Sequence, residues 1–266
     1  MFLNERKSKI NIDKNMLKKY KMDKIAYFDI ETTGFDKEDD VIMLISLGCF
    51  LDKESFYIKQ YYAENIKEEK NILIQFKQDI KKYSAWCSYN GKAFDEPFIV
   101  NRMLKSNISN FIPPAEHVDL YRLIRPYYKQ LGMERCNLKS VEKYIGINRL
   151  DKIDGGMSVE LYNKYLRTND EKLKDTIMLH NYEDVLNLPK IFRVVFDIEN
   201  SSEVVRDHSI TEKQLRYLKF LLNKNNMDMD TPLERISKKA ASKVIDLLLK
   251  GNCEVDELLD IINNSY

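Results

Sequence analysis

Residues 25–34 read Ile25-Ala26-Tyr27-Phe28-Asp29-Ile30-Glu31-Thr32-Thr33-Gly34. The first of them form a short apolar, aromatic-rich run of the length expected for a buried strand. Side chains two apart on a strand point to the same face, so Asp29 and Glu31 would project together. Two carboxylates at the end of an apolar strand are costly unless a positive charge neutralises them. Either the strand ends in an exposed acidic turn, or the pair holds a divalent cation such as Mg²⁺ or Mn²⁺.

The composition is that of a soluble globular protein, with 266 residues, 44% of them hydrophobic and 32% charged. The net charge of +1 neither favours nor excludes a nucleic-acid partner, so any basic surface must be local. No run approaches the roughly 20 apolar residues that a membrane helix needs. The start of the chain has no apolar core of signal-peptide length, and the four cysteines lack zinc-site spacing. These features predict a cytoplasmic protein without a membrane partner.

Three segments divide the chain. Residues 1–22 are basic and loosely amphipathic, and we interpret them as an N-terminal arm that either contacts phosphate or packs on the main domain. Residues 23–200 form that domain, and 209–266 form a small helical C-terminal unit. Nine basic and five acidic residues give 209–250 a charge of +4, which indicates either a phosphate-binding patch or a solvated face.

The pattern after the opening strand predicts two more strands, at 41–50 and 55–63. Short polar turns join them, which is typical of an antiparallel meander. A helical segment at 64–83 and a short buried strand at 85–89 follow. We therefore expect an α/β fold.

A third acid stands where this last strand gives way to a helix. Residues 90–99 read NGKAFDEPFI, so the chain turns at Asn90 and a helix begins near Asp95. Asp95 either complements the helix dipole or adds a third carboxylate to the first pair. Asn90 either holds the turn or hydrogen-bonds a nucleotide, and Phe94 either belongs to the core or stacks on a base.

The last acidic signal lies on a long helix expected over about 170–188. His180 and Asp184 are four residues apart and share one helix face. Taken alone, they could equally be an ordinary His–Asp pair. We expect 151–156 to be an acidic, flexible turn and 194–207 to be a polar break after the helix.

Taken in order, DIETTG at 29–34, NGKAFDEP at 90–97 and HNYEDV at 180–185 resemble the three exonuclease motifs of the DEDD superfamily. The likeness covers roughly residues 24–196 and is strongest to the YprB-type exonuclease domain. It implies a ribonuclease H-like fold, in which a mixed sheet (an antiparallel meander plus parallel strands) is flanked by helices.

The resemblance implies a site for two divalent cations, Mg²⁺ or Mn²⁺, held by Asp29, Glu31, Asp95 and Asp184. Asp29 would bridge the two, Glu31 and Asp184 would complete one position, and Asp95 would hold the other, through water. His180 would be the general base, because imidazole titrates near neutral pH. Its H-x-x-x-D spacing departs from the family patterns Y-x-x-x-D and H-x-x-x-x-D, with Tyr182 as a poorer alternative. Residues expected to contact the substrate are Thr32, Thr33, Gly34, Asn90 and Phe94.

The implied reaction is hydrolysis of phosphodiester bonds of RNA or DNA from a 3′ end, releasing nucleoside 5′-monophosphates. A structure-selective endonuclease would use the same acids. A nucleic-acid-binding module without catalysis is a further alternative, although all four acids are present.

Overall fold

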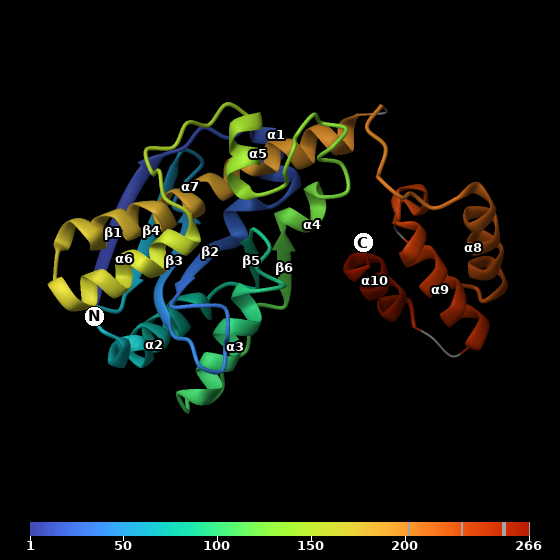
Figure 1. Cartoon of the computed structure of the whole chain (residues 1–266). Helices are drawn as coiled ribbons and strands as arrows, with labels where there is room; N and C mark the ends of the chain where they lie inside the picture. Colours follow the sequence, from blue (N-terminus) through green and yellow to red (C-terminus); the bar gives the residue numbers. More distant parts are fainter. Residues whose placement is uncertain (202, 230, 252–253, 266) are drawn as a thin grey trace. The chain divides into compact units, whose positions relative to one another are not determined.

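A computed structural model describes residues 1–201, 203–229, 231–251 and 254–265. Its centre is a six-stranded sheet with the strand order β1-β4-β3-β2-β5-β6 (Figure 1). The strands are β1 (Phe2–Lys9), β2 (Ile25–Thr32), β3 (Ile42–Phe50), β4 (Ser55–Tyr62), β5 (Ala85–Ser88) and β6 (Glu116–Asp119). Strands β1 to β4 pair antiparallel, whereas β2, β5 and β6 run parallel. The predicted mixed sheet, a meander plus parallel strands, is therefore confirmed.

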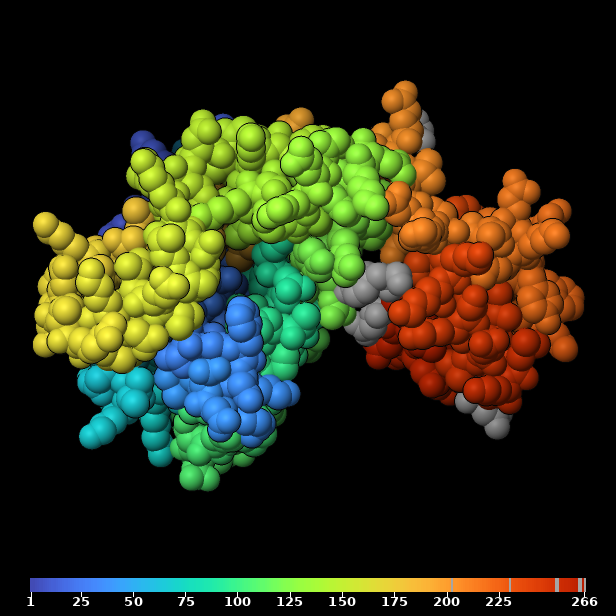
Figure 2. Space-filling model, viewed as in Figure 1, coloured from blue at the N-terminus to red at the C-terminus, as the bar shows by residue number. Residues whose placement is uncertain are grey.

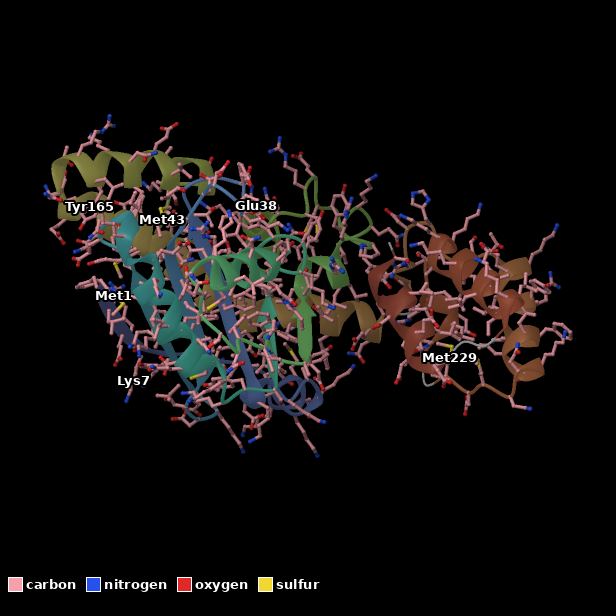
Figure 3. The ribbon with its side chains drawn as sticks, turned by 90° about the horizontal axis from the view of Figure 1, so that it is seen from below. Met1, Lys7, Glu38, Met43, Tyr165 and Met229 are labelled. Carbon is pink, nitrogen blue, oxygen red and sulfur yellow. The ribbon has the colours of Figure 1, made fainter. Side chains whose placement is uncertain are left out.

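Helices cover both faces of this sheet (Figure 1). Helices α2 (Glu69–Ile80) and α3 (Asp95–Lys105) pack on one face with Phe28 and Ile30 of β2. Helices α6 (Gly155–Thr168) and α7 (Glu171–Asn200) pack on the other, where Met43 of β3 and Tyr165 of α6 share a core cluster (Figure 3). The remaining helices of this region are α1 (Lys14–Lys19), η1 (Met22–Lys24), η2 (Ile66–Glu68), α4 (Leu120–Ile124) and α5 (Leu138–Tyr144).

The first strand of the sheet was not expected from the sequence. Residues 2–9, within the segment interpreted as an arm, pair along their whole length with β4. Most of their side chains are exposed, so this edge strand lacks the apolar alternation that marks a half-buried strand. The apolar residues that follow it, Ile10, Ile12, Met16 and Leu17, are buried.

Helix α7 is longer than expected. It continues to Asn200 with Pro189 inside it, so the polar break expected from residue 194 is wrong at its start. Proline disfavours a helix interior, which made 188 a natural end in the sequence. Residues 191–198 instead bury Ile191, Phe192, Val194 and Ile198, and this packing outweighs the local preference.

Contacts divide the described chain into two units, one formed by 1–121 with 137–196 and the other by 122–136 with 197–266. The second unit contains α8 (Glu212–Lys224), η3 (Leu233–Arg235), α9 (Lys238–Lys250) and α10 (Val255–Asn264) around its own apolar core. Thr211 caps α8 through a reciprocal capping box with Gln214, as the sequence indicates. None of the described helices is both long and apolar enough to cross a membrane.

Candidate active site

Strand β2 presents Asp29 and Glu31 on the sheet face that α6 and α7 cover. The alternating residues Phe28 and Ile30 point into the opposite core, as the strand period requires. The β2–β3 register shifts between Glu31 and Thr32, so a bulge interrupts the ladder directly after the second acid. The sheet therefore delivers two carboxylates at the point where its regular pairing stops.

Helix α7 places His180 and Asp184 over the same face. It approaches the sheet closely at Gly48 of β3, where an added Cβ would lie 2.7 Å from Val185 Cγ1. The Phe56 ring would lie equally close, so glycine at this position lets the helix and this ring pack tightly against β3. The sequence-predicted His180–Asp184 face is thus brought onto the acids of β2.

A buried polar chain of Gln60, Ser46 and Asn181 orients Asp29. Gln60 Nε2 donates to Ser46 Oγ at 3.0 Å, and Ser46 in turn donates to Asn181 Oδ1. Asn181 Nδ2 then donates to Asp29 Oδ2 at 2.6 Å. The three polar residues of this chain are at most 1% exposed, so their hydrogen bonds fix the Asp29 carboxylate from behind.

Asp95 reaches β2 from the first turn of α3. Its Oδ1 accepts a hydrogen bond from the Ile30 amide at 3.2 Å, which places the carboxylate beside the strand between the two acids. The preceding turn is held by Asp119, which accepts from the amides of Asn90 (2.8 Å) and Lys92 (3.2 Å). Asn90, at φ 68°, therefore serves the turn that presents Asp95.

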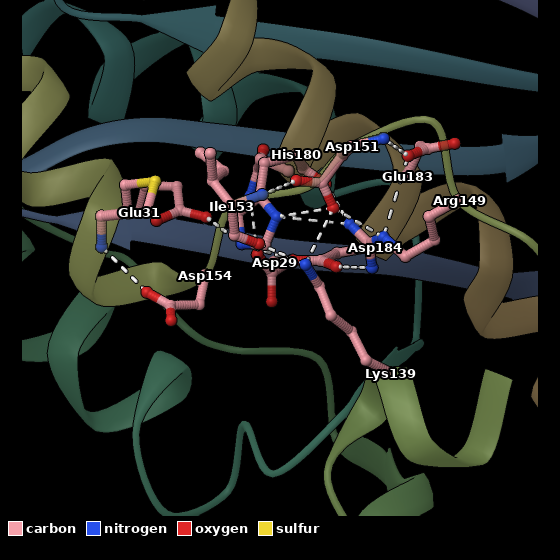
Figure 4. A network of polar contacts seen from close by, with 12 residues as sticks. Asp29, Glu31, Lys139, Arg149, Asp151, Ile153, Asp154, His180, Glu183 and Asp184 are labelled. Carbon is pink, nitrogen blue, oxygen red and sulfur yellow. Dashed lines mark hydrogen bonds and ion pairs between the residues drawn. The ribbon is translucent and has the colours of Figure 1, made fainter. Parts of the chain in front are cut away.

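His180 lies among the carboxylates (Figure 4). Its Nδ1 is 3.1 Å from Asp151 Oδ2, and its Nε2 is 3.7 Å from Glu31 Oε1 and 3.6 Å from Asp184 Oδ2. Ligand atoms of Glu31, His180 and Asp184 all lie within 4.8 Å of one another. Carboxylate and imidazole donors at this spacing suit Mn²⁺, and the carboxylates suit Mg²⁺. The residues present therefore fit a divalent cation.

Burial and crowding disfavour the charged carboxylates. Burial, followed by the negative charge of Asp184, raises the pKa values of Asp29 and Glu31 well above their usual range. Burial also raises the pKa of Asp95 to about 7, against the effect of the Ile30 amide. A bound cation would relieve this cost, which is the electrostatic signature expected of a metal site.

This crowding makes stability depend on pH. Between its ordinary pKa of 3.8 and about 7, Asp95 keeps its proton in the folded state only, so stability falls as the pH rises through this window. We expect the melting temperature of the metal-free protein to fall between about pH 5 and about pH 8. Saturating Mn²⁺ or Mg²⁺ should raise it at about pH 8 by on the order of 5–10 °C, and by less at about pH 5. Thermal-shift measurements with EDTA or metal check this, and an equal metal effect at both pH values would contradict it.

Arg149, in the segment between α5 and α6, carries a positive charge into the site (Figure 4). Its Nε lies 2.8 Å from Asp151 Oδ2, its Nη1 is 3.2 Å from Glu142 Oε1 and pairs with Asp184 Oδ1, and its Nη2 donates to the His180 carbonyl at 2.8 Å. The side chain is 6% exposed. Burial alone would lower the pKa of Arg149, but Asp184 and Glu142 raise it, so the group stays charged.

Asp29, Glu31 and Asp184 border a cavity of about 440 Å³, whereas Asp95 is not among the described residues that line it. It opens on the face seen in Figure 2, between the start of α6 and the segment after β2. Thr32, Gly34 and Phe94 line it, so they remain candidates for substrate contact. Thr33 and Asn90 are not among the described residues that line it. The Thr33 hydroxyl instead donates to Asp40 Oδ1 at 3.1 Å and accepts from the Val41 amide at 3.0 Å.

Gly34 has a local structural reason as well. An added Cβ would lie 2.2 Å from Asp40 Oδ2, so a larger residue would displace the Asp40 side chain, which accepts hydrogen bonds from the Thr33 hydroxyl and the Asp36 amide. Tyr182, the alternative base, is turned away from the acids. Its hydroxyl is 2.6 Å from Ser8 Oγ of β1, and Arg6 lies over its ring at 5.1 Å. Of the two candidates for the general base, His180 is therefore the one that lies beside the acids.

The sequence interpretation assigned no role to Arg149, Asp151 or Asn181, although the segments that contain them contribute to the family likeness. The expectation of a flexible turn at 151–156 is wrong, because Asp151 is buried and Asp154 caps α6 by accepting from the Met157 amide. Asp154 stands directly before Gly155, the first residue of α6, and an aspartate at this capping position could have predicted the helix start. The local sequence does not indicate a role for Arg149, because only the fold brings it to Asp184.

The α/β fold and its acidic cavity define a protein of the ribonuclease H-like class. The chain belongs to the RNase_H superfamily, whose family model matches residues 26–196.

Two known proteins are similar to this chain. The chain is 26% identical over 229 residues to the uncharacterized protein YprB of Bacillus subtilis (strain 168), a match that covers 84% of this chain and 54% of that protein. The chain thus spans about half the length of this relative. The family B DNA polymerase from the hyperthermophilic archaeon Pyrobaculum calidifontis is structurally similar, with a TM-score of 0.50 and 17% identity. That match covers 86% of this chain and 27% of the polymerase, and it shows a shared fold.

Proposed function

We propose that the protein is a metal-dependent 3′–5′ exonuclease of the DEDD type that hydrolyses phosphodiester bonds of RNA or DNA. One observation carries the proposal: the acids of β2 and α7 line a single cavity with His180, and Asp95 of α3 is hydrogen-bonded to the same strand at the Ile30 amide. Burial and mutual charge raise the pKa values of Asp29, Glu31 and Asp95. Such convergence of ionisable groups is typical of catalytic sites.

Each acid has a proposed role. Asp29 would bridge two cations, Mg²⁺ or Mn²⁺, with Glu31 and Asp184 at one position and Asp95 at the other. The cations would activate a water molecule and stabilise the leaving oxygen of an in-line displacement. Arg149 occupies Oδ1 of Asp184, which leaves Oδ2 toward His180 and Glu31. The protein groups thereby fix the orientation of Asp184 before any ligand binds.

The cavity also suits a nucleotide. Phe35 is 89% exposed and lies 6.0 Å from Phe94, ring centre to ring centre, so two aromatic rings stand at the same cavity. Aromatic rings are the usual stacking surface for bases. Gly155 and Gly156 form the first turn of α6 and line the opposite side, where a helix N-terminus favours a phosphate.

The direct test uses end-labelled single- and double-stranded RNA and DNA with Mg²⁺, Mn²⁺ or EDTA. We expect metal-dependent release of nucleoside 5′-monophosphates from the 3′ end. Full activity in EDTA would contradict the proposal. Cleavage of a circular substrate would assign the same site to an endonuclease, and tight binding without cleavage would indicate a silent binding module.

His180 is proposed as the general base, positioned through Nδ1 by Asp151. Changing His180 to glutamine should lower kcat by on the order of 10²–10⁴-fold. The grouping of His180 Nε2 with Glu31 and Asp184 supports a second role, as a metal ligand. Titrating Mn²⁺ into metal-free H180Q separates the two roles. Wild-type affinity with reduced kcat agrees with a base, whereas a parallel loss of affinity would assign a ligand.

Phe35 should contribute to substrate binding. Changing Phe35 to alanine is expected to raise KM by about 5- to 150-fold, since stacking of one base contributes about 1–3 kcal/mol. The exposed ring makes little core contact, so the melting temperature should not change. Steady-state kinetics with Leu51→Ala, another exposed apolar residue, as the control check this. An unchanged KM for F35A would remove Phe35 from the binding site.

A further inference from the structure

The second unit, built from 122–136 and 197–266, contains a cavity of about 570 Å³ that lies entirely within it. Basic side chains from three segments line it: Arg125, Lys129, Arg206, His208, Lys238 and Lys239. Among the described residues that line it, Asp207 is the one acid. We call this site the basic cavity.

Backbone hydrogen bonds hold the three segments together. The Asp207 amide donates to the Pro126 carbonyl at 2.8 Å, and the Lys238 amide donates to the His208 carbonyl at 2.8 Å. His208 adopts a left-handed conformation (φ 56°), which is uncommon for residues other than glycine. These hydrogen bonds therefore hold the backbone of the basic residues in place, including the strained backbone of His208.

Two lysines of the basic cavity lie where a helix disfavours them. Lys238 and Lys239 are the first two residues of α9, behind the capping residue Ser237. The helix dipole is positive at this end, and a cation there costs typically about 0.3–1 kcal/mol. The first turn of α9 contains no acid that would offset this cost. A bound anion would turn this unfavourable placement into a favourable one.

Arg206 adds positive charge to the basic cavity from a second segment. Its Nε is closed to solvent, so an anion in the cavity would not reach that atom, and Arg206 supports the proposal through its charge alone.

We propose that the basic cavity binds the phosphate backbone of a polynucleotide. Six basic groups on three segments exceed what a single phosphate needs, and the half-buried ring of Tyr128 adds an aromatic surface among them. Basic groups interleaved with an aromatic ring are typical of single-strand binding. This inference rests on the proposed nuclease function, and it gives the second unit the role of holding substrate by charge.

The test measures binding by the full chain in EDTA, where no cleavage occurs. The probe is a fluorescein-labelled single-stranded oligonucleotide of about 20 nucleotides, as DNA and as RNA, followed by anisotropy. The K238Q/K239Q variant should bind on the order of tenfold more weakly. The slope of log affinity against log salt should become shallower by about 1.4, since each phosphate that is no longer neutralised removes about 0.7. The melting temperature of this variant should not fall, because two unfavourable charges leave the helix start.

The matched control is K224Q/K250Q, which removes two exposed lysines from the last turns of α8 and α9, outside the basic cavity. We expect it to bind like the wild type. Equal weakening of both variants, or wild-type binding by K238Q/K239Q, would overturn the inference. Competition by polyglutamate as strong as by unlabelled oligonucleotide would also overturn it, and competition by inorganic phosphate alone would assign a single-anion site. If the wild-type chain binds the oligonucleotide but does not cleave it when Mg²⁺ or Mn²⁺ is present, only the proposed function is contradicted.

Discussion

Replacing Asp29 with asparagine is expected to abolish metal-dependent nucleotide release. Asp29 is the acid on which the other three carboxylates act, and its proposed role is to bridge the cations. Loss of several kcal/mol of charge stabilisation at a metal site corresponds to a rate loss of about 10³-fold or more. Single-turnover release from an end-labelled oligonucleotide in Mg²⁺ and in Mn²⁺ measures this loss.

Asparagine keeps the shape of the side chain and can still accept the Asn181 hydrogen bond. Because burial raises the pKa of Asp29, removing its charge should leave the metal-free protein at least as stable as the wild type. The pH dependence of its melting temperature should become shallower. Asp39→Asn, an exposed acid outside the cavity, is the control and should retain full activity. A D29N rate within threefold of the control would refute the proposed role, because a threefold change corresponds to only about 0.65 kcal/mol of activation free energy.

Replacing Arg149 with methionine is expected to destabilise the protein by about 3–5 kcal/mol. The change leaves Glu142 and Asp151, each with a side chain 1% exposed, without their guanidinium partner. In a chain of this size the melting temperature should fall by on the order of 6–20 °C. Urea unfolding in EDTA gives the free energy directly.

The double variant R149M/E142Q tests the cause of this loss. It removes one of the stranded charges and should recover part of the stability, which a purely steric effect would not. Lysine at 149 should be intermediate, because it keeps the charge but not the forked geometry. Arg167→Met, an exposed arginine of α6, is the matched control. If R149M melted within a degree or so of the control, the stabilising role of Arg149 would be wrong.

Local sequence rules were sufficient for the parts of the site that one element determines. The two-residue period of β2 predicts that Asp29 and Glu31 share a face, and the four-residue spacing on α7 predicts the same for His180 and Asp184. Asp95 stands at a strand-to-helix junction, which the turn at Asn90 marks. These predictions require only the geometry of a single strand or helix.

Other parts depend on distant contacts and leave no local pattern. Strand β1 pairs with residues far along the chain, from Ser55 to Tyr62, and its own residues are mostly exposed. Arg149 belongs to an irregular segment, and only the packing of α7 brings it to Asp184. Asn181 looks like any polar residue on a helix until Ser46 and Asp29 are placed beside it. Pro189 locally disfavours the continuation of α7, but burial further along the helix outweighs this cost.

The Arg149 guanidinium among the carboxylates has a consequence for the order of folding and metal binding. Arginine does not lose its proton at any physiological pH, so the chain carries its own counter-ion from the moment it folds. We therefore expect folding and metal loading to be separable: the metal-free chain should fold in EDTA, and a chelator added to the metal-loaded protein should not unfold it. If the proposed function holds, cellular metal supply would set how much of the protein is active, and not how much of it is folded.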